Sequence, residues 1–159
     1  MGFVDKLYKF TRYLIFVFLA AMSIILLMQV FSRSFFNYSF KWAEELARIL
    51  LVWITFLGAG VAYREKALAA FNMLEAKLTG AYKTVHIFVL QAMILIFSSV
   101  VVIYGIKLIT RPIMLHQTTP TLKIPMYILY SAVPVGILFI ILYTVVYLKE
   151  VIQNRKSQA

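Results

Sequence analysis

The chain has 159 residues, no cysteine and a formal net charge of +10. Its hydrophobic fraction is 63%, against roughly 45–50% in soluble domains, and its charged fraction is 14%, against roughly 25%. So few charges exclude an ordinary soluble enzyme domain and a disordered tail, and the absence of cysteine excludes a disulfide-built secreted module. The basic residues lie mainly at the ends of apolar segments, with no interleaved aromatic stripe, so nucleic-acid binding is not expected. The composition predicts a single integral-membrane domain over residues 1–159.

Three charge-free runs predict transmembrane helices. They cover residues 13–32, 84–106 and 124–148. Each reaches the about 20 residues that a helix needs to cross about 30 Å of hydrocarbon. These runs predict an all-α membrane protein with at least three spans.

A fourth run is too short to cross the membrane by itself. It covers residues 49–63, about 22 Å of helix at about 1.5 Å per residue. Extension back to Trp42 gives a span over 42–63 of adequate length. This extension brings Glu44, Glu45 and Arg48 into or near the membrane boundary. The sequence therefore predicts four transmembrane helices, one of which begins with charged residues.

The distribution of lysine and arginine predicts the orientation. Ten of them lie in the N-terminal, middle and C-terminal segments on one side, and six lie on the other side. Because cytoplasmic segments are enriched in basic residues, both termini are expected in the cytoplasm. The first span is longer than a signal-peptide core and no small-residue cleavage site follows it, so it is expected to remain as an anchor.

A short amphipathic helix is expected between the second and third spans, over about 65–79. Its apolar positions recur at helical spacing: Leu68, Phe71, Leu74 and Leu78. Such a helix would lie on the cytoplasmic membrane interface and end near Gly80. The alternative is that the second span continues and bends out of the membrane.

Small residues four apart predict close helix packing within the spans. The pairs are Gly58 with Ala62, and Ala132 with Gly136. Small side chains let helix backbones approach closely in lipid. Pro134 is expected to kink the last span or to free a carbonyl group.

The sequence has few residues that could act in catalysis or bind a metal ion. His86 and His116 are 30 positions apart, and no phosphate-binding G-x-x-x-x-G-K-[ST] motif occurs. The first, third and fourth spans contain no acidic residue, whereas a transporter acting alone usually has acidic or polar groups near the midplane. We therefore expect no catalytic, substrate-binding or metal site, no cofactor and no enzymatic activity.

The start of the second span has the most informative charges. On a helix, Arg48 can reach Glu44 four positions before it and Glu45 three positions before it. In the first interpretation, the cluster is an internal ion-pair group whose side chains extend to the headgroups. In the second interpretation, part of it faces another protein chain. Both interpretations remain open at this level.

At these residues the chain resembles the small membrane subunit of tripartite ATP-independent periplasmic (TRAP) transporters. The resemblance is carried first by Trp42-Ala43-Glu44-Glu45-Leu46-Ala47-Arg48, and then by Trp53 and Phe56-Leu57-Gly58-Ala59. Further stretches that resemble the family lie at 29–33, before this motif, and at 119–125 and 130–136, after it. The likeness covers about residues 5–150. One departure is that family members often have a histidine and an aspartate after the second span, where this chain has no histidine and Asn72 stands near the acidic position.

The resemblance implies a four-span, non-catalytic subunit in the bacterial inner membrane. Such a subunit pairs with a large membrane subunit that carries the sodium and substrate sites, and it acts as a scaffold for that subunit. A periplasmic substrate-binding protein delivers a carboxylate of the sialic acid or C4-dicarboxylate type, and membrane lipids surround the complex. By residue match, the subunit interface would contain Trp42, Glu44, Glu45 and Arg48.

Two alternatives stay open. One is a self-contained four-span small-molecule exporter, which would need Glu44 or Glu45 as its membrane carboxylate. The other is an anchor subunit of a respiratory membrane complex, in which His86 would ligate haem or contact quinone.

Overall fold

A computed structural model of the chain describes residues 2–65 and 81–156, and these residues form an all-α membrane protein. Four helices are long and apolar enough to cross a membrane, which confirms the predicted fold class. The helices are α1 (Gly2–Phe36), α2 (Lys41–Arg64), α4 (Ala81–Ile109), α5 (Pro112–His116) and α6 (Met126–Lys156).

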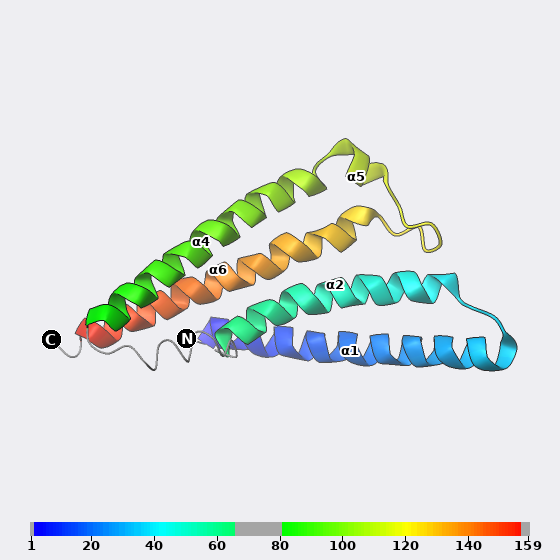
Figure 1. The fold of residues 1–159 in the computed structure, drawn as a ribbon, viewed down its shortest axis with the longest axis horizontal. Helices are drawn as coiled ribbons and strands as arrows, with labels where there is room; N and C mark the ends of the chain where they lie inside the picture. The colour runs from blue at the N-terminus through cyan, green and yellow to red at the C-terminus, as the bar shows by residue number, and fades with distance from the viewer. Residues whose placement is uncertain (1, 66–80, 157–159) are drawn as a thin grey trace.

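The long helices follow one another in the spatial order α1, α2, α6, α4 (Figure 1). α1 packs mainly on α2, α2 packs on α6, and α6 packs on α4. Both termini lie at the same end of the molecule, where the helices draw together, and the helices spread apart toward the other end (Figure 1). In this row the inner helices α2 and α6 are covered by neighbours on two sides.

α2 and α6 approach each other closely at Gly136. A methyl group on this glycine would lie 2.5 Å from the carbonyl oxygen of Phe56, a distance that real Cβ atoms essentially never show. One turn earlier on α6, Ala132 is fully buried. The missing side chain at position 136 therefore allows the two backbones to touch, as small residues do in membrane helix pairs.

On α2, Gly60 is the glycine that meets α6. A methyl group there would lie 3.0 Å from the Cβ atom of Phe139. A methyl group on Gly58 would meet no atom within 4 Å. Within this chain the close contact thus falls at Gly60, and close packing by Gly58 and Ala62 stays a prediction.

α6 and α4 meet where a proline faces a glycine. A methyl group on Gly105 would lie 3.5 Å from the Cδ atom of Pro134, which is an ordinary contact distance. α6 stays helical through Pro134, and this proline is buried. The ring of the proline therefore packs against the neighbouring helix.

The helices extend beyond the predicted spans at several ends, since α1 already begins at Gly2 and α6 continues to Lys156. α6 begins at Met126, two residues later than expected, because Pro125 forms an isolated bridge with Thr118 in the connection before it. α5 interrupts the same connection and is not predicted by the charge-free runs. The predicted interfacial helix over 65–79 lies, apart from Glu65, outside the described residues, and the cytoplasmic position of the termini stays a prediction.

Candidate subunit interface at the start of α2

The charged residues predicted at the start of the second span lie inside α2, which begins at Lys41. Arg48 donates a hydrogen bond to Glu44 at 3.2 Å, one helical turn away. The side chains of Arg48 and Glu44 are 66% and 69% exposed. In water an exposed pair of this type contributes only about 0.3–0.5 kcal/mol. The pair is therefore internal to α2, but it is not covered by any described part of the chain.

Glu45 points toward a different partner. Its two carboxylate oxygens accept hydrogen bonds from the backbone N–H groups of Thr121 and Leu122, each at 2.9 Å. These residues belong to the connection between α5 and α6. Glu45 therefore joins the start of α2 to this connection, and the described residues show no ion pair between Glu45 and Arg48.

The connection forms a turn that presents these N–H groups to Glu45. The N–H of Thr119 donates to Ile124 O at 2.9 Å, and Lys123 donates back to Thr119 O at 3.1 Å. The buried hydroxyl of Thr119 accepts a hydrogen bond from the N–H of Ile124 at 3.1 Å. Lys123 has a φ of 53°, in the left-handed region, which closes the turn. These bonds within the turn use the N–H groups of Thr119, Lys123 and Ile124. The N–H groups of Thr121 and Leu122 remain available to bind Glu45.

Aromatic rings surround the entry to α2. The ring of Trp42 lies 5.9 Å from the ring of Phe40, which in turn makes an edge contact with Tyr38 at 5.0 Å. Ser32 at the end of α1 donates to Tyr38 O at 2.9 Å. Trp42 is thus part of an aromatic group that links α1 to α2, and it stays partly exposed.

A second polar cluster lies at the opposite end of the helices. Arg64, the last residue of α2, forms an ion pair with Asp5 and donates to Val4 O at 2.9 Å. Its guanidinium lies 4.5 Å from the ring centre of Tyr8 and 5.4 Å from that of Tyr143. This arginine therefore connects α1 and α6 to α2. From the sequence it counts only among the basic residues that predict orientation, which does not indicate this structural role.

A buried hydrogen-bond group joins α2, α4 and α6. The hydroxyl of Tyr63 donates to Gln91 Oε1, and the hydroxyl of Thr144 lies 3.0 Å from that of Tyr63. Gln91 is 7% exposed and Thr144 is fully buried. These polar groups hold the helices together near the end that bears the termini.

The described residues offer no site for a metal ion, since no group of three histidine or acidic side chains comes together in them. His86 is half-buried in α4, and His116 is exposed in α5. The acidic residues with described side chains lie at helix ends: Asp5, Glu44, Glu45 and Glu65. The described parts of the spans therefore have no acidic group near their middle.

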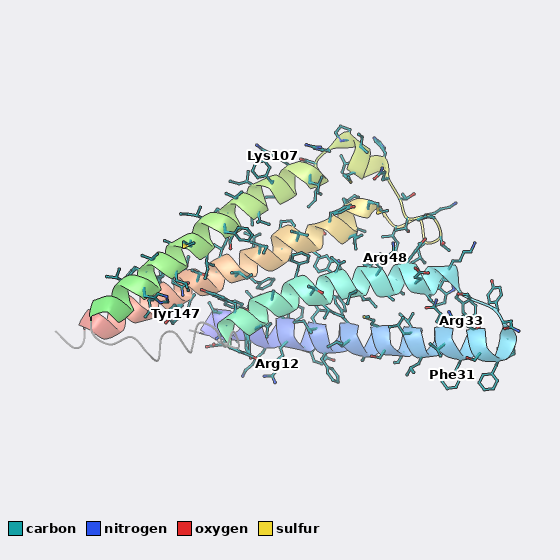
Figure 2. The ribbon with its side chains drawn as sticks, in the orientation of Figure 1. Arg12, Phe31, Arg33, Arg48, Lys107 and Tyr147 are labelled. Atoms are coloured by element: carbon teal, nitrogen blue, oxygen red, sulfur yellow. The ribbon has the colours of Figure 1, made fainter. Side chains whose placement is uncertain are left out.

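Figure 2 shows Arg48 on the part of α2 that lies nearer the α5–α6 connection than the termini. Arg33 and Phe31 lie at the same end on α1, and Arg12 lies near the opposite end. The Glu44–Arg48 pair and the Glu45 contact therefore belong to the end at which the helices spread apart.

Comparison with known proteins gives a consistent result. Residues 22–154 match the family model described as "Tripartite ATP-independent periplasmic transporters, DctQ component". A 95-residue segment is 26% identical to the "Isethionate TRAP transporter permease protein DctMQ" of Oleidesulfovibrio alaskensis, covering 60% of this chain and 15% of that protein.

Two shorter relatives agree with this match. The "C4-dicarboxylate TRAP transporter small permease protein DctQ" of Rhodobacter capsulatus is 26% identical over 95 residues, which is 60% of this chain and 42% of the relative. A "Putative TRAP transporter small permease protein" of Haemophilus influenzae is 35% identical over 78 residues, 49% of this chain and 48% of the relative. The matches span less than half the length of each of these relatives. With four apolar helices and a family model that matches most of its length, this multi-pass inner-membrane protein belongs to the DctQ component family of tripartite ATP-independent periplasmic transporters.

Proposed function

We propose that this chain is the non-catalytic small membrane subunit of a sodium-coupled, binding-protein-dependent secondary transporter. In this proposal it acts as a scaffold for a large membrane subunit, and a periplasmic protein delivers carboxylate substrates of the sialic acid or C4-dicarboxylate type. The family match supports the assignment to a transporter subunit rather than to a self-contained exporter or a respiratory anchor. The relative named DctMQ supports a large partner, because this chain matches only 15% of that permease protein.

The observation that carries the proposal is the position of the acidic residues. Asp5, Glu44, Glu45 and Glu65 lie at helix ends, so the described middle of the spans offers no carboxylate to bind sodium. Transporters usually bind their coupling ion near the midplane, with polar groups or broken helices. Relatives named for isethionate, a sulfonate, and for C4-dicarboxylates also share this type of chain, which supports substrate selection by another subunit.

The contact to the large subunit is proposed to include Trp42, Glu44 and Arg48. Support comes from the exposure of the Glu44–Arg48 pair on a span. Glu45 is proposed to act indirectly, because both of its carboxylate oxygens are occupied by the N–H groups of Thr121 and Leu122. It would hold the α5–α6 connection in place beside the contact.

Co-purification tests this proposal. The chain is expressed with an affinity tag together with its large membrane subunit, and the mass of the purified particle is measured in detergent. We expect one heteromeric complex with both subunits in equal amounts. A chain that purifies alone as a stable species while the large subunit assembles without it would contradict the proposal.

Orientation is a separate part of the proposal. We infer that both termini lie in the cytoplasm, because ten lysines and arginines lie on their side and six on the other. A C-terminal fluorescent-protein fusion is expected to fluoresce, and a C-terminal alkaline phosphatase fusion is expected to be inactive. The opposite pattern would reverse the topology.

A further inference from the structure

The exposed residues of α2 form one stripe along the helix. Every α2 residue that the structure leaves exposed belongs to it, and consecutive members are three or four positions apart. At about 100° per residue, they lie within an arc of about 80°. The members of this α2 stripe are Lys41, Glu44, Arg48, Leu51, Thr55 and Ala59.

The neighbouring helices leave this stripe uncovered. α1 packs on one part of α2 and α6 on another. The buried positions of α2, among them Ala47 and Leu57, lie outside the stripe. No other described helix packs extensively on α2. The α2 stripe therefore faces outward from the row of helices, toward lipid or toward another protein.

The chemistry of the α2 stripe differs from that of the other outward faces. The exposed positions of α4 are mostly large and apolar, among them Met93, Ile96 and Phe97, which are 65–67% exposed. Such side chains suit contact with lipid tails. The α2 stripe instead has charges in its first turns, and beyond them it contains only one large apolar residue, Leu51.

Two features of the stripe favour a protein helix over lipid. Charged side chains on a span usually face protein or water, because hydrocarbon offers them no partner. Beyond Leu51, the stripe continues with Thr55 and Ala59, and the adjacent Gly58 has open space around it. Small side chains are typical of positions where two membrane helices approach closely.

Building on the proposed function, we propose that the α2 stripe is the binding surface for a transmembrane helix of the large subunit, and that this helix carries an acidic side chain. Lys41 and Arg48 lie on either side of Glu44, so the charged part of the stripe has a net positive charge. Arg48 has five N–H donors, and one is assigned to Glu44 in the structure. An acidic side chain on the partner would complement the remaining positive charge.

Site-specific photo-cross-linking tests the location of the surface. A photoreactive phenylalanine analogue is placed at Leu51, Thr55 or Ala59 in the tagged chain, which is produced with the large subunit. Matched controls carry it at Met93 or Ile96 on α4. We expect adducts with the large subunit, identified by mass spectrometry, at least several-fold more from the stripe than from α4.

The outcomes separate this inference from the proposed function. An intact complex in which stripe positions form adducts only with lipid, or none, overturns the inference and leaves the proposed function standing. Absence of a complex with the unsubstituted chain contradicts the proposed function itself. Recovery of the complex in each variant shows that the chain has folded.

A charge exchange tests the acidic side chain. The double variant Glu44→Arg, Arg48→Glu keeps an ion pair within α2 but reverses the order of charges along the stripe. We expect the yield of complex to fall about tenfold, and a basic substitution of an acidic residue on the cross-linked helix of the large subunit to restore part of it. An unchanged yield in the double variant overturns the predicted charge contact.

Discussion

The backbone N–H of Leu122 donates a hydrogen bond to the carboxylate of Glu45, although the two residues are 77 positions apart in the sequence. The second carboxylate oxygen accepts from the neighbouring N–H of Thr121. A side chain from the start of α2 thus fixes the tip of the turn before α6. Within the motif over residues 42–48, Glu45 therefore has a structural role inside this chain.

Loss of the Glu45 carboxylate should loosen this turn. In Glu45→Ala, the N–H groups of Thr121 and Leu122 lose their acceptors, and we expect their amide hydrogens to exchange at least about tenfold faster. Hydrogen-exchange mass spectrometry over residues 117–126 measures this. Glu44→Ala is the matched control, because Glu44 pairs with Arg48 instead. Equal protection of the turn in both variants would show that the Glu45 contact is not formed.

A side chain at Gly136 should destabilise the packing of α2 against α6. A methyl group there would lie 2.5 Å from Phe56 O, so Gly136→Ala forces the helices apart. Overpacking of this kind typically costs about 1–3 kcal/mol. Thermal unfolding in detergent should show the loss. In the matched variant Gly58→Ala the added methyl group meets open space, so no loss is expected. Equal stability of the two variants would contradict the close contact.

The hydroxyl of Tyr63 should contribute to stability through its buried partners. In Tyr63→Phe, the amide oxygen of Gln91 loses its donor and the hydroxyl of Thr144 loses a neighbour. Leaving such a buried group without a partner costs about 1–3 kcal/mol. Thermal unfolding of the variant measures this, with Tyr104→Phe as control because Tyr104 is 66% exposed. A similar midpoint for both variants would argue against the buried hydrogen-bond group.

Arg64 should hold α1 to the rest of the chain. Its ion pair with Asp5 involves a carboxylate that is half exposed, so we expect a coupling of about 1 kcal/mol in a double-mutant cycle with Arg64→Met and Asp5→Asn. The single variant Arg64→Met should cost more, because it also removes the contact with the ring of Tyr8. Unfolding midpoints of the four proteins give the coupling. Strict additivity of the two substitutions would show that the pair contributes nothing.

The spans are predictable from the sequence because lipid demands long charge-free helices. Even the short second run is placed well, since the start of α2 at Lys41 agrees with the extension needed to cross the membrane. The spacing of Glu44 and Arg48 permits the ion pair that the structure shows. These features depend only on periodicity and length within a single helix.

The features that the sequence does not predict depend on how helices face one another. The choice of Gly60 over Gly58 as the close contact follows from the rotation of α2 against α6, which a spacing of four residues leaves undetermined. The partner of Glu45 lies in a distant turn, and helical spacing suggested Arg48 instead. Nothing in the sequence of this turn indicates which side chain would bind its N–H groups.

Transport by reconstituted subunits tests the central claim most directly. Liposomes are prepared with the large subunit alone, with this chain alone, and with both, and uptake of a labelled carboxylate is measured with its binding protein and an inward sodium gradient. The account predicts uptake only when both subunits are present. Sodium-driven uptake by this chain alone, or full uptake by the large subunit without it, would contradict the account.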